Sequence, residues 1–181
     1  MGTEEKGAAR RIWKFDRALF AAIFRVKSPV FTRVMRAFTV IGTAGFLWGV
    51  IAGFAFLLTG LEPWRLILPW GAVAASWIIA ELSKNLFDRA RPSISDSEIA
   101  PLIKTPSSSS FPSGHAATAA AGALTLSITY PPLAPLLVLA GLLVALSRVY
   151  LGVHYPFDVL AGITIGVVTT SLFLTIAGLL A

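Results

Sequence analysis

Two long apolar runs are joined by a short polar segment in residues 133–181, LAPLLVLAGLLVALSRVYLGVHYPFDVLAGITIGVVTTSLFLTIAGLLA. The first run extends from Leu133 to about Tyr150, and the second from about Pro156 to Ala181. Each approaches the roughly 20 residues that a helix needs to cross about 30 Å of hydrocarbon. Because lipid offers the backbone no hydrogen-bond partners, such continuous runs are expected to be membrane-spanning helices.

The composition of the whole chain supports a membrane protein. Of its 181 residues, 56% are hydrophobic and 13% are charged, whereas soluble domains carry roughly 25% charged residues. Three further apolar runs precede residue 133: Ala37 to Leu61, Leu66 to about Phe87, and a run from Pro112 or Ser113 that ends before Tyr130. None alternates as barrel strands do. The sequence therefore predicts an all-α, polytopic membrane helix bundle with five transmembrane helices.

The N-terminal segment differs from the rest of the chain. Residues 1–38 carry nine of the fifteen Lys and Arg residues, mixed with apolar residues at helical spacing. This pattern predicts a basic amphipathic helix in the membrane interface over residues 1–36, followed by a transmembrane domain over residues 37–181. The net charge of +6 indicates an anionic lipid partner rather than nucleic acid, because the basic residues are interleaved with apolar ones. The absence of cysteine excludes disulfides and thiol catalysis.

Most polar residues after position 80 are expected at one end of the bundle. With five spans, the end of the second, the start of the third, the end of the fourth and the start of the fifth share one face. The polar residues at these places are Lys84, Arg91, Ser113, His115, Arg148, His154 and Asp158. We therefore predict a single polar site at this end.

These residues form three clusters with fixed spacing. The clusters are Lys84 with Arg91-Pro92, then Pro112-Ser113-Gly114-His115, then Ser147-Arg148 with His154 and Asp158. Together they resemble the signature of the type 2 phosphatidic acid phosphatase superfamily, the lipid phosphatases related to glucose-6-phosphatase and vanadium haloperoxidases. All eleven defining positions match in order, and the resemblance covers about residues 40–175.

The residue types fit phosphoryl transfer. Lys84, Arg91 and Arg148 supply three positive charges for the phosphate oxygens, and two guanidiniums can bind phosphate bidentately. Ser113 and Gly114 leave backbone amides open at a helix N-terminus, where anions bind. Each residue alone fits a snorkelling anchor or a helix cap equally well, but their joint spacing favours a phosphate site. No cysteine, histidine or carboxylate cluster has metal-ligand spacing, so neither metal nor cofactor is expected.

The resemblance also implies catalytic roles. His154 would attack phosphorus and form a phosphohistidine, while Asp158 would bond the other ring nitrogen and fix the tautomer. Asp158 also suits a simpler role, an acidic residue in the first turn of a helix. His115 would protonate the leaving oxygen of the lipid and later activate the hydrolytic water. Glu81, one turn before Lys84, receives no role in the signature.

Several alternatives stay open. A haloperoxidase would be soluble and far longer, and a transporter would carry ionisable residues near the bilayer midplane, where this chain has none. A non-catalytic lipid binder would not be expected to keep the complete signature. Among substrates, undecaprenyl diphosphate is favoured over phosphatidylglycerophosphate, followed by the lipid A 1-phosphate and phosphatidic acid. The positive-inside rule favours a cytoplasmic site in the inner membrane, whereas bacterial relatives mostly act on the outer face; side and oligomeric state are not predicted.

Overall fold

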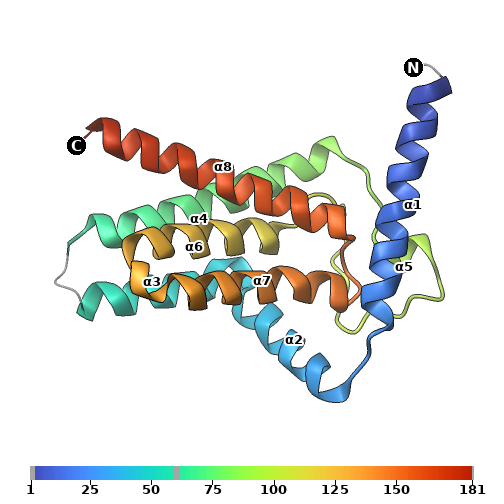
Figure 1. Cartoon of the computed structure of the whole chain (residues 1–181), viewed down its shortest axis with the longest axis horizontal. Helices are drawn as coiled ribbons and strands as arrows, with labels where there is room; N and C mark the ends of the chain where they lie inside the picture. The colour runs from blue at the N-terminus through green and yellow to red at the C-terminus, as the bar shows by residue number, and fades with distance from the viewer. Residues whose placement is uncertain (1–2, 59–61, 181) are drawn as a thin grey trace.

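The computed structural model describes residues 3–58 and 62–180, and all regular elements within them are helices. This confirms the all-α prediction. Five helices run along the long axis of the molecule (Figure 1). They are α3 (Phe46–Leu58), α4 (Trp64–Ser83), α6 (Gly114–Thr129), α7 (Ala134–Tyr150) and α8 (Pro156–Leu180). The remaining α-helices are α1 (Thr3–Arg25), α2 (Pro29–Ile41) and the short α5 (Pro92–Ser95).

Helix α6 occupies the centre of the bundle, packed against α4, α7 and α8. Ten of its sixteen residues are buried, and most of these are Ala, Gly or Thr. Small side chains let the neighbouring backbones approach closely, which is how helices associate where lipid removes the hydrophobic drive. The fully buried Trp48 of α3 lies against Gly122, where an added Cβ would come within 2.2 Å of its ring.

Helices α6 and α8 pack with their backbones close together. A Cβ added at Gly162 would lie 2.3 Å from the carbonyl oxygen of Ser113, and one at Gly166 would lie 2.3 Å from that of Ala117. These two glycines are four residues apart and therefore share one face of α8. This contact brings the second and third turns of α8 against the first two turns of α6.

The membrane-crossing elements agree in part with the predicted count. Within the described residues, three stretches are long and apolar enough to cross a membrane: Trp64–Leu86, Pro131–Tyr150 and Pro156–Ile176. The pair of helices before residue 58 makes a fourth if it is one span. Helix α6 has 16 residues, or about 24 Å at 1.5 Å per residue, which is less than a full crossing. The chain is thus a multi-pass helical protein.

The first predicted span, Ala37 to Leu61, is not one straight helix. Helix α2 continues to Ile41, and the chain bends by 53° before α3. Backbone geometry explains the bend, since Ala44 and Gly45 have positive φ angles of 50° and 76°. The expected ends of the first and last spans, Leu61 and Ala181, lie outside the described residues.

Gly45, Gly49 and Gly53 recur at every fourth position, and two of the three pack closely against a neighbouring helix. Added Cβ atoms at Gly45 and Gly49 would meet the side chains of Val73 and Trp70 on α4, whereas one at Gly53 would meet nothing within 4 Å. The sequence did not reveal Gly162 and Gly166 as the glycines that pack against backbone atoms, because small residues occur throughout the apolar runs.

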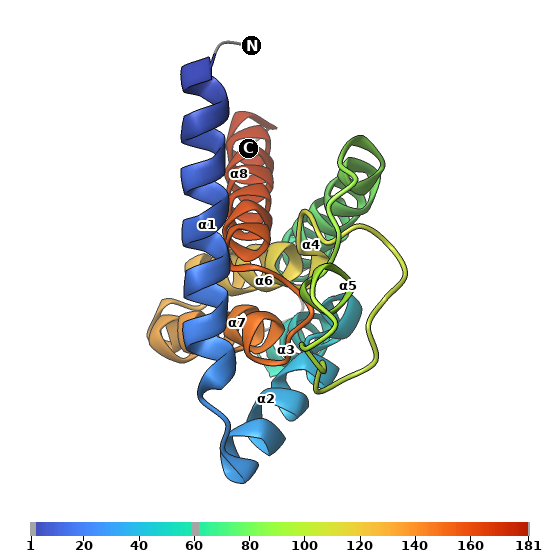
Figure 2. The same cartoon turned by 90° about the vertical axis from the view of Figure 1, so that its right-hand side faces the viewer.

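Helix α1 lies across the end of the bundle, at a steep angle to its axis (Figure 1, Figure 2). It ends at Arg25, just before Pro29 begins α2. The N-terminal segment predicted as one amphipathic unit is therefore two helices, and α2 continues past residue 36 into the bend. Helix α1 contacts α7 and α8, so it lies at the end where these two helices are joined.

The α6–α8 contact predicts a large effect of one methyl group. Replacing Gly166 by alanine would press a Cβ against the Ala117 carbonyl and lower stability by about 1–3 kcal/mol, the usual cost of overpacking. The matched control, Gly53→Ala, adds the same methyl where nothing lies within 4 Å. Thermal unfolding in detergent, followed by tryptophan fluorescence, should show a lower Tm only for Gly166→Ala. Equal Tm values for the two variants would contradict the packing.

Candidate functional site

A cavity of about 350 Å³ lies where the end of α4, the start of α6 and the end of α7 meet the adjoining loops. Its lining residues are Thr43, Ala44, Trp77, Glu81, Lys84, Arg91, Pro106, Ser108, Gly114, His115, Thr118, Arg148 and His154. Six of the eight predicted site residues are among them. The other two, Ser113 and Asp158, are fully buried and do not line the cavity. A larger cavity of about 920 Å³ beside α1 is lined mostly by apolar residues and contains no histidine.

Lys84 is paired with Glu81. The Nζ atom of Lys84 lies 2.6 Å from Oε1 of Glu81, one helical turn earlier. The same carboxylate oxygen would lie 3.0 Å from a Cβ added at Gly114, so only glycine fits there without displacement. Glu81 therefore offsets one of the three positive charges at the cavity.

Arg91 joins two loops and reaches the candidate nucleophile. The side chain is only 1% exposed. Its Nε donates to the carbonyl of Ser108 at 2.9 Å, Nη2 to that of Ser109 at 3.1 Å, and Nη1 to that of Val153 at 2.9 Å. Nη1 also lies 3.2 Å from Nε2 of His154. Arg91 thus fixes the serine-rich loop and the His154 loop around the cavity, a role the signature alone did not indicate.

Arg148 occupies the last turn of α7 and is buried. Its Nη1 donates to the hydroxyl of Thr39 on α2. Its carbonyl accepts the amides of Val153 and His154, each at 3.2 Å. Gly152 permits this tight return of the chain with a φ of +81°, a value that side chains disfavour. The turn places His154 beside Arg148.

The ring of His154 is held in one tautomer. Its Nδ1 lies 2.7 Å from the carbonyl oxygen of Ser110, and since a carbonyl only accepts, Nδ1 carries the proton and Nε2 keeps its lone pair. Burial lowers the pKa of His154 to about 4; Asp158 opposes this shift, while Arg148 and Arg91 add to it. At neutral pH the ring is therefore uncharged, as a nucleophile must be.

The expected direct hydrogen bond from Asp158 to His154 is not formed. Oδ2 of Asp158 lies 3.6 Å from Nδ1 of His154, beyond hydrogen-bonding distance. That oxygen accepts instead from the hydroxyl of Ser110 at 2.5 Å and the amide of Tyr155 at 2.8 Å. Nδ1 of His154 donates its hydrogen bond to the Ser110 carbonyl instead. Asp158 binds the hydroxyl of the same serine and therefore orients His154 through Ser110. The bond to Tyr155 also caps the start of α8, so the simpler role holds as well.

His115 lies on the first turn of α6, half-buried, with Nε2 3.4 Å from the hydroxyl of Thr43. Ser113 is the N-cap of the helix, and its hydroxyl accepts the amide of Ala116 at 3.4 Å. Gly114 and His115 precede that bonded amide and line the cavity. Their position fits the anion-binding helix terminus predicted from the sequence.

Three residues behind the site were not identified from the sequence: Asp16, Arg89 and Ser110. Nη1 of Arg89 lies 2.5 Å from Oδ1 of Asp158, and its Nη2 pairs with Asp16 of α1. One signal could have revealed Asp16, since Trp13 and Phe20 lie on the same face of α1 and a charge there needs a buried partner. Arg89 and Ser110 lie in a polar loop, where no periodicity distinguishes buried residues from exposed ones.

Comparison with known proteins identifies relatives. A phosphatidylglycerophosphatase B from Bacillus subtilis is 32% identical over 173 residues, which cover 83% of this chain and 77% of that protein. An undecaprenyl-diphosphatase from Sulfolobus acidocaldarius is 39% identical over 90 residues, 49% of this chain and 44% of that protein. The chain therefore spans less than half of the Sulfolobus relative's length.

A solved structure agrees in fold over nearly the whole chain. The crystal structure of a transmembrane PAP2-type phosphatidylglycerolphosphate phosphatase from Bacillus subtilis has a TM-score of 0.78 and 28% identity, and the match covers 94% of this chain and 88% of that one. The family model described as the PAP2 superfamily matches residues 65–179, which contain all three signature clusters. This match extends over more than half of the chain, and the protein therefore belongs to the PAP2 superfamily.

Proposed function

We propose that this protein is an integral membrane phosphatase that hydrolyses a phosphate monoester or diphosphate of a lipid through a phosphohistidine on His154. The observation that carries the proposal is the neutral His154 ring, whose Nε2 lies beside the guanidinium of Arg91 at a cavity that Lys84 and Arg148 also line. A nucleophile among fixed cations is what phosphoryl transfer requires.

The residues support a two-step reaction. Lys84, Arg91 and Arg148 hold the non-bridging oxygens, aided by the α6 terminus at Ser113 and Gly114. Nε2 of His154 then forms a bond to phosphorus as the bond from phosphorus to the lipid oxygen breaks.

His115 completes both steps. It gives its proton to the departing lipid oxygen, and in the second step it takes a proton from water, whose oxygen displaces His154 and releases inorganic phosphate. Asp158 keeps His154 oriented through Ser110 throughout.

An apolar cavity next to the charged one supports a lipid substrate. It has a volume of about 390 Å³, lies between α3 and α4, and shares Ala44 and Trp77 with the charged cavity. A phosphate headgroup could occupy the charged part while its hydrocarbon chain lies between the helices. This arrangement favours a lipid phosphate over a soluble anion as the ligand.

The relatives named above are an undecaprenyl-diphosphatase and a phosphatidylglycerophosphatase, and lipid A 1-phosphatases match as well. Their names support a lipid phosphate as substrate, and the order among the candidates stays the one proposed from the sequence. We place a polyprenyl diphosphate first and phosphatidylglycerophosphate second, with the lipid A 1-phosphate and phosphatidic acid after them. The loop over residues 93–111 borders the cavity at Pro106 and Ser108 and is the proposed source of headgroup selectivity.

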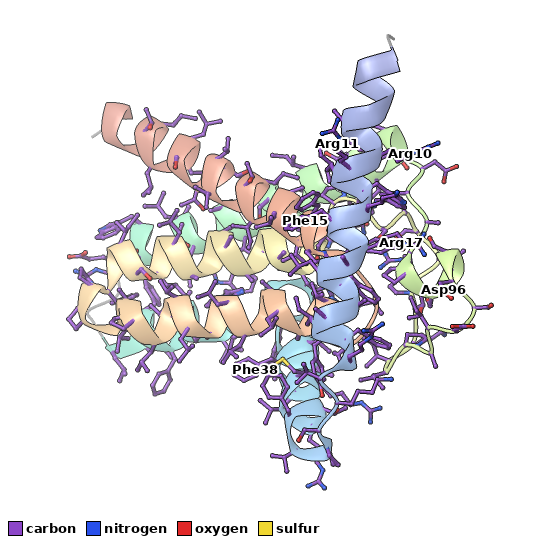
Figure 3. The ribbon with its side chains drawn as sticks, turned by 45° about the vertical axis from the view of Figure 1, so that its right-hand side comes forward. Arg10, Arg11, Phe15, Arg17, Phe38 and Asp96 are labelled. Atoms are coloured by element: carbon purple, nitrogen blue, oxygen red, sulfur yellow. The ribbon has the colours of Figure 1, made fainter. Side chains whose placement is uncertain are left out.

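The proposed membrane arrangement has five spans in the inner cell membrane, with α6 as the short central one. Helix α1 would lie in the interface, where its exposed apolar residues Ile12, Phe15 and Leu19 would face lipid. Arg10 and Arg11, which lie on the same helix (Figure 3), would face anionic headgroups. Because α1 contacts the active-site end, both lie on the same side of the membrane. Residues 1–36 then act as the interfacial unit and residues 37–181 as the catalytic one.

The purified protein should release inorganic phosphate from lipid phosphates in detergent with EDTA present, because three side-chain cations neutralise the phosphate. A panel of undecaprenyl diphosphate, phosphatidylglycerophosphate and phosphatidic acid should rank in that order by kcat/KM. His154→Ala protein prepared identically controls for contaminating phosphatases. Activity that disappears with chelator and returns with magnesium would contradict the mechanism.

The two histidines should respond differently to the leaving group. His154→Ala should abolish turnover of every substrate, because no phosphoenzyme forms. His115→Ala should lose about 10²–10⁴-fold in kcat with an alkyl phosphate, whose alkoxide needs a proton, and much less with an aryl phosphate. Steady-state rates on matched alkyl and aryl substrates measure the difference. Equal losses for His115→Ala on both substrates would show that its assigned role is wrong.

A further inference from the structure

A buried ionic bridge connects α1 to the active-site loops. The side chains of Asp16 and Asp158 are 0% exposed, and that of Arg89, between them, is 15% exposed. Nη1 of Arg89 bonds Oδ1 of Asp158 at 2.5 Å, while its Nη2 bonds Oδ2 of Asp16. One guanidinium therefore compensates two carboxylates that water does not reach, with one Nη atom of its planar group on each carboxylate.

Two aromatic rings and a backbone amide hold the bridge in place. The guanidinium of Arg89 lies between two aromatic rings, 4.6 Å from the centroid of Trp13 on α1 and 4.5 Å from that of Tyr155. The second oxygen of Asp16 accepts the amide of Phe157 at 2.9 Å, in the first turn of α8. Helix α1 thus holds both the arginine and the helix that carries Asp158.

The bridge continues to His154 through Ser110. Asp158 accepts the Ser110 hydroxyl at 2.5 Å, and the carbonyl of the same serine binds Nδ1 of His154 at 2.7 Å. The amide of Ser110 donates to the carbonyl of Arg89 at 2.8 Å. Arg89 therefore holds Ser110 twice, by its own backbone and through Asp158.

We propose that Asp16 and Arg89 are positioning residues for the nucleophile, through which docked α1 holds the His154 ring in its reactive tautomer and orientation. Neither residue lines the cavity of His115 and His154, so neither contacts the substrate phosphate. Loss of the bridge leaves the phosphate-binding residues in place and misaligns the attacking nitrogen. The inference rests on the proposed function of His154 and assigns to the N-terminal helix a role in the reaction itself.

The test compares Arg89→Lys and Asp16→Asn with the control Arg17→Gln. Arg17 is the next residue on α1, is exposed and makes only a long 3.9 Å pair with Asp96 (Figure 3). Arg89→Lys keeps the charge but replaces two fixed Nη donors with a single nitrogen, which cannot hold both carboxylates in the same geometry. The kcat should therefore fall on the order of 10²-fold, the cost of a small misplacement of a reacting group. The KM and the inhibition constant of inorganic phosphate should change less than about twofold.

Asp16→Asn should lose less, because its amide oxygen can still accept from Phe157, and the double variant should lose no more than Arg89→Lys alone. Arg17→Gln should match the wild type.

The state of the ring gives a second readout that a merely structural role would not change. In protein labelled with ¹⁵N-histidine, the wild type should show His154 as the Nδ1–H tautomer, and Arg89→Lys should show a mixture of tautomers. If Arg89→Lys does not fold, Asp16→Asn decides by the same two readouts.

Unchanged kcat and tautomer in both bridge variants, or a rise in KM with constant kcat, would overturn the inference. If the wild type hydrolyses no lipid phosphate, the proposed function fails, and the tautomer comparison still tests the positioning.

Discussion

The carboxylate of Asp158 is shielded from water at the start of α8, and the geometry of the site depends on how its two oxygens are satisfied. A buried carboxylate without partners would cost several kcal/mol, and three groups donate hydrogen bonds to this one. Oδ1 receives Arg89, and Oδ2 receives the Ser110 hydroxyl and the Tyr155 amide, while the His154 ring lies 3.6 Å away. The electrostatic requirement of one side chain therefore connects the polar loop, the start of α8 and the candidate nucleophile.

Close helix packing sets where this carboxylate lies. Glycines at 162 and 166 bring α8 against the backbone of α6, and the amide of Ser113 donates to the carbonyl of Asp158 at 3.0 Å. The helix terminus proposed to bind phosphate and the helix that carries Asp158 are thus joined by one backbone hydrogen bond. Stability of the bundle and geometry of the site share the same contacts, since a shift of α8 would displace both.

The sequence predicted the helical bundle from the length of its apolar runs. It also predicted six of the residues that line the cavity, from the spacing of the signature. The third apolar run was expected to begin at Pro112 or Ser113, and Ser113 is the N-cap of α6. The bend at Ala44 and the pairing of Asp158 with Ser110 and Arg89 were not predicted. The bend depends on backbone angles that a Gly-rich segment allows but does not require. The partners of Asp158 are distant in the sequence, since Ser110 precedes it by 48 positions and Arg89 by 69. Asp16 was not predicted either. The basic and apolar residues around it fit an interfacial helix, and its partner Arg89 is distant in the sequence.

The central claim is that the Ser110 carbonyl holds Nδ1 of His154 and thereby leaves Nε2 to attack phosphorus. The most direct measurement is to identify the phosphoenzyme. The His115→Ala variant, turned over with a ³²P-labelled aryl phosphate and quenched in alkali to preserve phosphohistidine, can be digested and its labelled peptide examined by NMR. The account predicts phosphate on His154 at Nε2. Phosphate at Nδ1, or on any other residue, would contradict it.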